Sequence, residues 1–243
     1  MRVTVPIISY GGTVHAHYMQ GMLGLVNQCA SKGINVDYPL IHFESLISRA
    51  RNASAAAALN NKSDYLFFID TDVIFNPKDF FKLLEADKDV CVGLYPKKYI
   101  SQQKLQFLFS KFSQLPNCWK ELVGDLSSEC KPQKMNETIE VDYAATGFML
   151  IKTEVFKEIA KQKPETKYKN DIDGYMGYGD NFYDFFRCQV NPETKKYESE
   201  DYGFCKVWQE CGGKIHAIPD IKLGHRGSYI FEGSFREQQK AFR

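Results

Sequence analysis

The chain has 243 residues, of which 44% are hydrophobic and 14% aromatic, enough to bury one substantial core. Its 31 basic and 30 acidic residues give a net charge of +1, so no overall field attracts nucleic acid or an acidic membrane surface. These values predict a single domain over residues 1–243 and argue against a nucleic-acid partner.

Cysteine usage indicates a reducing compartment, and hydropathy indicates neither a membrane span nor a signal peptide. The seven cysteines are odd in number and none lies in a CxxC arrangement, which argues against a disulfide scaffold or a zinc site. No stretch reaches the eighteen apolar residues of a membrane span, and the first residues, MRVTVPIISYGG, lack the apolar run of a signal peptide. We therefore expect a cytoplasmic protein without a transmembrane segment, in the host cytoplasm if the chain is viral.

Strand-like and helix-like segments alternate over the first hundred residues. The apolar patterns predict strands at 3–9, 36–42, 65–69 and 89–94 and helices at 15–31, 46–60 and 79–86. Ser45 is the predicted N-cap of the second helix. Because strands that alternate with helices form parallel sheets, we expect an α/β fold with a mostly parallel sheet covered on both faces.

The second half of the chain is less regular. Residues 98–140 are polar and weakly periodic, which predicts irregular or short antiparallel structure, and 163–198 are typical of a long functional loop. Between and after these segments the pattern predicts strands at 139–143, 147–151, 215–218 and 221–223 and helices at 153–160 and 201–211.

The stretch DYLFFIDTDVIFNP places two carboxylates, Asp70 and Asp72, where a buried strand ends. Ligands of open α/β sheets bind at this carboxyl edge, and residues two apart in extended chain point the same way. Hard divalent cations are often held by one or two such carboxylates together with a phosphate-bearing substrate. The alternative is that Asp70 caps the following turn and Asp72 is solvated.

A second cluster, ISRARN, lies in the helix before that strand. Arg49 and Asn52 share a helix face and Arg51 lies about a quarter turn away. Guanidinium groups beside a metal-carboxylate site can bind phosphate, a base or the aspartates themselves. The alternative is a surface arginine pair that solvates the helix.

Two further clusters come late in the chain. Glu200 and Asp201 fall in the first turn of a predicted helix, where acidic residues stabilise the helix dipole; that role alone accounts for Glu200. Asp201 would be ionised there and able to accept a proton in a closed site. His225 follows the last predicted strand between two glycines and could complete a metal site as a neutral imidazole, the alternative being a structural role.

Taken together, these clusters resemble the metal-dependent glycosyltransferases of the GT-A fold, a Rossmann-like α/β fold with a small antiparallel part on the acceptor side. The resemblance is closest to small single-domain enzymes, some viral or bacterial, that are similar to the large inverting glycosyltransferase family. It covers most of the chain through seven segments in the family's order: PIISYGG, SLISRARN, FFIDTDVIF, VGLYPKK, YAATGFMLIK, SEDYGFCKVW and KLGHRGSY.

The resemblance implies that residues 1–97 bind a nucleotide sugar and that 98–243 supply the acceptor and catalytic side. It implies a donor site with the following residues: Pro6, Ile8, Tyr10, Arg49, Arg51, Asn52, Asp70, Thr71, Asp72 and Gly147. It also implies that Asp70, Asp72 and His225 bind Mn²⁺ or Mg²⁺. Asp201, with Glu200 beside it, would supply the general base.

The expected function is transfer of a sugar from a UDP- or GDP-sugar to a glycan or other acceptor hydroxyl, with inversion at the anomeric carbon. Two other functions remain open. A sugar-nucleotide nucleotidyltransferase would also use a sheet edge and a metal, but the Gly11-Gly12 turn lacks the arginine and lysine of its phosphate loop. A noncatalytic carbohydrate-binding protein could stack sugars on the fourteen tyrosines. Such a protein would not need Asp70, Asp72, Asp201 and His225 together.

Overall fold

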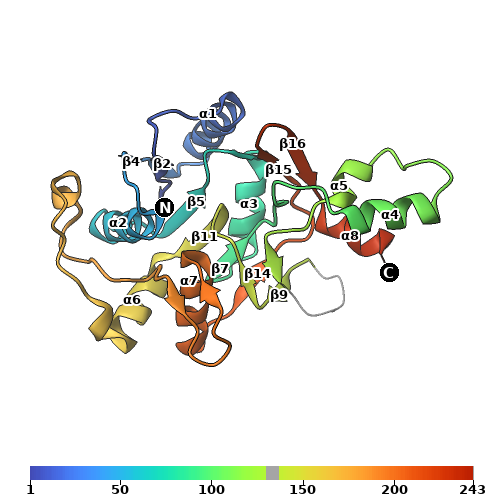
Figure 1. The fold of residues 1–243 in the computed structure, drawn as a ribbon. Helices are drawn as coiled ribbons and strands as arrows, with labels where there is room; N and C mark the ends of the chain where they lie inside the picture. Colours follow the sequence, from blue (N-terminus) through green and yellow to red (C-terminus); the bar gives the residue numbers. More distant parts are fainter. Residues whose placement is uncertain (130–136, 243) are drawn as a thin grey trace.

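The computed structural model describes residues 1–129 and 137–242, which form an α/β fold around a central sheet (Figure 1). Cys130 and part of the predicted irregular segment 98–140 lie outside the described residues. The other six cysteines carry free thiols. Among the described helices, none combines the length and apolar character that a membrane crossing requires.

The described residues form a seven-stranded central sheet in the order β3, β1, β5, β11, β7, β14, β9. In that order the strands are Asn35–Asp37, Arg2–Thr4, Tyr65–Ile69, Phe148–Lys152, Val90–Val92, Ile215–Ala217 and Ile139–Val141. Five of them share one direction, whereas β11 and β9 run against it. The prediction of a mostly parallel sheet is confirmed, and β11 is the antiparallel strand that joins β5 to β7.

Successive residues of the buried strands enter two separate cores. Leu66 and Phe68 of β5 pack on one face with α2, α6 and α7, whereas Phe67 and Ile69 pack on the other face with α1 and α3. These helices are Ile47–Asn60 (α2), Thr153–Gln162 (α6), Glu200–Glu210 (α7), Ala16–Ser31 (α1) and Lys78–Glu85 (α3). Because side chains alternate along a strand, a strand covered on both faces reads as an unbroken apolar run. Helices therefore cover both faces of the sheet, as predicted.

Two predicted strands are each divided at a proline. The strand predicted at 3–9 becomes β1 and β2 (Ile7–Ser9) on either side of Pro6, and that at 36–42 becomes β3 and β4 (Leu40–His42) around Pro39. Proline has no N–H to donate to a strand ladder, so the regular pairing is interrupted there. Beyond the prolines, β2 and β4 pair in parallel as a separate ribbon.

Helix α2 begins differently from the prediction. Its N-cap is Leu46 and makes no side-chain cap hydrogen bond, so the prediction of Ser45 as the cap is wrong. Instead, the Glu44 carboxylate accepts a hydrogen bond from the Leu46 N–H at 2.9 Å. A carboxylate near these first amides also suits the positive end of the helix dipole.

Residues 102–123 contradict the prediction of irregular structure, because they form α4 (Gln102–Lys111) and α5 (Trp119–Val123). With α8 (Phe235–Ala241), which the sequence pattern did not predict, these helices lie beyond the edge of the sheet (Figure 1). They enclose a small apolar cluster of their own around Leu108 and Leu122. Short antiparallel structure follows as expected, since β8 (Ser128–Glu129) pairs with β10 (Tyr143–Ala144).

Residues 163–198 form the expected long connection but contribute to the core. They hold two 3₁₀ turns, Pro164–Thr166 (η1) and Asp173–Tyr178 (η2), and a hairpin of Gln189–Val190 (β12) and Tyr197–Glu198 (β13). Four of their aromatic side chains are buried: Tyr175, Phe182, Phe185 and Phe186. The expectation that this segment lies outside the core is therefore wrong.

A second, three-stranded antiparallel sheet positions the histidine. It consists of β16 (Ile230–Gly233), β15 (Leu223–Arg226) and β6 (Val73–Ile74). In its register His225 is paired with Val73, the residue after Asp72. The predicted strand at 221–223 thus starts later and continues through the histidine, which carries His225 to the carboxyl end of β5.

Candidate active site

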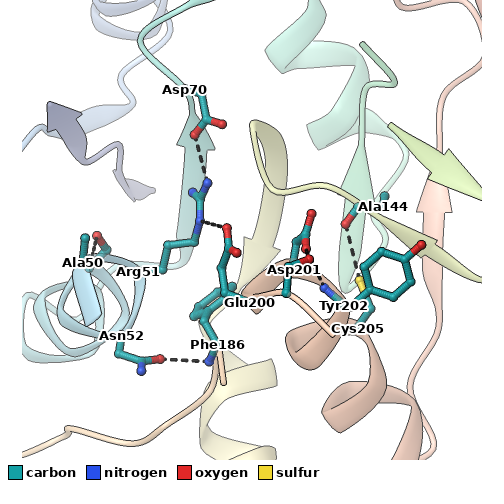
Figure 2. Close-up of polar contacts among 12 residues, drawn as sticks. Ala50, Arg51, Asn52, Asp70, Ala144, Phe186, Glu200, Asp201, Tyr202 and Cys205 are labelled. Carbon is teal, nitrogen blue, oxygen red and sulfur yellow. Dashed lines mark hydrogen bonds and ion pairs between the residues drawn. The ribbon is translucent and has the colours of Figure 1, made fainter. Parts of the chain in front are cut away.

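Arg51 lies between two carboxylates from distant parts of the chain (Figure 2). Its Nη2 is 3.0 Å from Oδ1 of Asp70, at the end of β5, and its Nε is 3.4 Å from Oε1 of Glu200, in the first turn of α7. The side chain of Arg51 is only 4% exposed. This three-residue bridge therefore ties α2, β5 and α7 together at the carboxyl edge of the sheet.

Burial and charge act in opposite directions on Arg51. Burial alone would lower the pKa of Arg51, but Asp70 and Glu200 outweigh it and raise the pKa above its usual value. The guanidinium also lies 5.0 Å from the centroid of the Phe68 ring, a cation–π contact. One of its terminal nitrogens, Nη1, is buried without a hydrogen-bond partner in the described part of the chain. Arg51 is thus a fixed positive charge with one donor unsatisfied.

Asp72 and His225 form the second polar group of the site. Oδ1 of Asp72 lies 3.4 Å from Nε2 of His225, and Oδ2 lies 2.5 Å from Nζ of Lys98. The other ring nitrogen of His225, Nδ1, is 2.8 Å from the carbonyl oxygen of Pro96. Because a carbonyl only accepts, Nδ1 carries the hydrogen of this bond, and Nε2 is the ring nitrogen that faces Asp72.

The Asp72 carboxyl is strongly acidic in this setting. Burial acts to raise the pKa of Asp72, but the hydrogen bonds and charges of His225 and Lys98 outweigh burial and lower the pKa to about 2. The Asp72 carboxylate is therefore ionised at any physiological pH.

The Asp72 and His225 pair fits a divalent cation. An Nε2 lone pair and a carboxylate oxygen 3.4 Å apart repel each other unless a proton or a cation lies with them. Two neighbouring ligands of an octahedral ion with bond lengths of about 2.1 Å lie about 3 Å apart. In the described residues, however, no three or more His, Cys, Asp or Glu side chains gather as a ready metal site. Oδ1 of Asp70, which was also predicted as a ligand, contacts Arg51.

Gly147 leaves space for the side chains of the site. A Cβ built on Gly147 would lie 2.6 Å from the Tyr95 hydroxyl and 2.8 Å from Oδ2 of Asp70. The N–H of Asp70 donates to the carbonyl oxygen of Gly147 at 2.9 Å. Burial, and then the charge of Asp70, raise the pKa of Tyr95 well above its usual value, so its phenol stays neutral. The start of β11 is thus in contact with Asp70.

Glu200 and Asp201 have separate environments in the first turn of α7. Glu200 contacts Arg51, so it does more than interact with the helix dipole. Oδ1 of Asp201 accepts from the Ser199 hydroxyl and, at 2.9 Å, from the Tyr202 N–H. These contacts hold the Asp201 carboxylate at the helix N-terminus beside the Arg51 bridge (Figure 2).

Two residues of the ISRARN cluster face away from Asp70 and Asp72. Arg49 makes a two-pronged contact with Glu44 at 2.7 and 2.9 Å. The Asn52 amide nitrogen donates to the Asp184 carboxylate at 2.9 Å. Its amide oxygen accepts from the Phe186 N–H, also at 2.9 Å (Figure 2). Asn52 therefore fixes the 182–186 segment onto α2.

The remaining predicted donor residues lie near the same edge of the sheet. Pro6 is buried, Ile8 is half-buried and Tyr10 is 68% exposed, and all three follow β1, which is parallel to β5. Thr71 lies half-buried between the two aspartates. Parallel strands end at one edge, so β1 and β5 bring these groups to the same side.

Lys98 was missed as a site residue, although its segment, VGLYPKK, was among those in the resemblance. The signal was available: the segment follows β7, which runs parallel to β5, so its lysines belong to the same edge as Asp72. Which of Lys97 and Lys98 reaches the carboxylate depends on how the chain turns after β7.

The sheet order, the antiparallel β11 and the site at the carboxyl edge together define a GT-A-type, Rossmann-like α/β fold. No family profile matches the sequence, and no curated protein matches it. Among solved structures, the chain is similar to A197 from STIV, with a TM-score of 0.51 and 15% identity over 96% of this chain and 95% of that chain. At this identity the likeness shows a shared fold.

Solved glycosyltransferases also match at lower scores. The structure of GalNAc-T7 with UDP, GalNAc and Mn²⁺ matches with a TM-score of 0.49 and 12% identity, over 92% of this chain and 43% of that chain. The structure of TarS from S. aureus, residues 1–349, matches with a TM-score of 0.40 and 12% identity, over 90% of this chain and 58% of that chain. This chain therefore spans about half the length of these two structures.

Proposed function

We propose that the protein is a glycosyltransferase that moves a sugar from a nucleoside-diphosphate sugar, UDP- or GDP-linked, to an acceptor hydroxyl with inversion. The observation that supports this most directly is the Asp72 and His225 pair at the end of β5, adjoining the Arg51 bridge. A dication bound by this pair, Mn²⁺ or Mg²⁺, would neutralise the charge that develops on the departing diphosphate.

In this proposal Asp72 and His225 are the protein ligands of the cation, and the Pro96 carbonyl keeps Nε2 of the histidine free for it. Asp70 remains paired with Arg51 and faces the ribose. Nη1 of Arg51 has no hydrogen-bond acceptor among the described residues. Because buried polar groups are normally hydrogen-bonded, an oxygen of the bound nucleotide would be a suitable acceptor for it. Pro6, Ile8, Tyr10 and Thr71 would surround the nucleoside.

Asp201 would act as the general base. Its Oδ1 is engaged by Ser199 and Tyr202, which orients the carboxylate so that the other oxygen can accept the proton of the acceptor hydroxyl. Attack by that hydroxyl on the face opposite the diphosphate inverts the anomeric carbon. Glu200 would instead hold Arg51 in place, so the two neighbouring acids have different roles.

The test is release of nucleoside diphosphate from a panel of UDP-, GDP- and dTDP-sugars with a panel of acceptors, with Mn²⁺ and with a chelator. We expect turnover with one donor, lost on chelation. Asp72→Asn should lose metal-dependent donor binding, and Asp201→Asn should retain donor binding and lose transfer. Asp89→Asn is the matched control, because that exposed carboxylate precedes β7 at the opposite edge of the sheet.

Other outcomes would point to the two alternative functions. Consumption of a nucleoside triphosphate with release of pyrophosphate would support a nucleotidyltransferase. Sugar binding without turnover of any donor would support a noncatalytic carbohydrate-binding protein.

A further inference from the structure

The segment after β7, residues 95–99, contacts the Asp72 and His225 pair in three ways. The ring of Tyr95 meets that of His225 edge-on, with centroids 5.0 Å apart. The Pro96 carbonyl accepts from Nδ1 of the same histidine, and Nζ of Lys98 contacts Oδ2 of Asp72. One short segment therefore orients the histidine and also supplies a positive charge to the aspartate.

The position of Lys98 is determined by the turn that carries it. The Lys97 N–H donates to the Asp125 carbonyl at 2.7 Å, and the Tyr99 hydroxyl bonds the Asp125 carboxylate. The Lys98 stem passes beside Gly227, since a Cβ built there would lie 3.5 Å from Cδ of Lys98. Both neighbours of Lys98 are thus bound to Asp125, Lys97 through its backbone and Tyr99 through its side chain, while the ammonium of Lys98 reaches Asp72.

We propose that Lys98 is a displaceable counter-cation: it neutralises Asp72 when no dication is bound, and a dication must displace its ammonium before binding Asp72. This inference rests on the proposed function. An ammonium in contact with one carboxylate oxygen and a dication on the other would be two positive charges a few ångströms apart, which is unfavourable unless one leaves. Lys98 can leave at small cost because its side chain is 41% exposed and flexible.

Displacement leaves the ammonium next to the position of the diphosphate. The lysine remains anchored by its turn, so it would move only the length of its side chain. Its positive charge would then face the donor phosphates, as a point-charge partner. Lys98 would therefore weaken binding of the free metal ion and favour binding of the metal ion together with the nucleotide.

The test is a titration with Mn²⁺ alone, followed by the electron paramagnetic resonance signal of the free ion, on the full chain without nucleotide. Lys98→Gln should bind Mn²⁺ about two- to fivefold more tightly than wild type, the range expected when a partly exposed ion pair no longer competes. Lys98→Arg retains the charge and should stay near wild type. Lys97→Gln removes the same charge from the adjacent position, which faces Asp125, and should also stay near wild type.

Asp72→Asn tests whether the measured Mn²⁺ binds at Asp72. We expect this substitution to abolish tight Mn²⁺ binding in the wild-type protein and in Lys98→Gln. Equal Mn²⁺ affinity in wild type and Lys98→Gln would overturn the counter-cation role and leave the proposed function intact. Absence of Mn²⁺ binding in both proteins would also overturn it, and the transfer assay with chelator then tests the proposed function independently. Circular dichroism of each variant confirms that the fold is kept.

Discussion

Replacing Arg51 with methionine tests the central electrostatic feature of the site. Methionine keeps most of the volume but leaves Asp70 and Glu200 without their shared partner. Removing one member of a buried ion pair costs about 3–5 kcal/mol. Since Asp70 is 31% and Glu200 15% exposed and both can regain some water, we expect the lower end, about 3 kcal/mol.

The measurement is urea unfolding at pH 7, followed by tryptophan fluorescence, with the midpoint and slope fitted separately. Arg49→Met is the matched control: the same substitution two residues earlier on α2, where the side chain is 36% exposed and pairs only with Glu44 among the described acidic groups. Glu44 is only 3% exposed, but without Arg49 it keeps its hydrogen bonds from the Leu46 N–H and the Tyr175 hydroxyl, so we expect a smaller cost of about 1–2 kcal/mol. A double-mutant cycle with Glu200→Gln should give a coupling of about 1 kcal/mol.

If Arg51→Met costs no more than Arg49→Met, the buried bridge does not stabilise the fold and the reasoning fails. If Arg51→Met is strongly destabilising but the double-mutant cycle shows no coupling between Arg51 and Glu200, the contact of Arg51 with Asp70 alone accounts for the lost stability.

Three other predictions follow from the geometry. Gly147→Ala should destabilise the fold by about 1–3 kcal/mol and reduce turnover, because the new Cβ would overlap the Tyr95 hydroxyl; Gly174→Ala, where a Cβ meets no atom within 4 Å, should change little in the same unfolding and turnover assays. The pKa of Asp72 lies at about 2, below its ordinary value of 3.8, so Asp72 contributes stability above about pH 4 that is lost as the pH falls towards 2. In buffer with EDTA, the wild-type urea midpoint should therefore fall more steeply over that range than that of Asp72→Asn, and parallel curves would contradict the assignment. Asn52→Leu should cost about 1–3 kcal/mol, because a buried backbone N–H at residue 186 loses its acceptor, and hydrogen exchange should show faster opening of 182–186; unchanged exchange would mean that Asn52 does not hold this segment.

Much of the fold could be predicted because the relevant signals are local. The run at 65–69 gives a strand with the predicted bounds, since a strand buried on both faces is continuously apolar. The helix predicted at 153–160 begins where expected for the same local reason. By contrast, α4 was missed because only Leu108 in it is buried, against a small cluster apart from the main core, so its periodicity is weak.

The candidate site was predicted in part. The sequence places Asp70, Asp72 and His225 at the ends of strands, which brings them to one edge, but not which carboxylate takes which partner. That Asp70 pairs with Arg51 while Asp72 faces His225 depends on the register between β15 and β6, a long-range feature. The partner of Glu200 was missed for the same reason, since Arg51 lies 149 residues earlier in the chain.

The antiparallel strand β11 has a consequence for dividing this chain into fragments. It lies between β5 and β7, so the segments 1–97 and 98–243 interleave within one sheet. A polypeptide that stops after residue 97 would expose the facing backbone edges of two apolar strands, which are templates for pairing with other copies. Fragments cut at that boundary are therefore expected to self-associate, and expression of a donor-binding half alone should yield insoluble material.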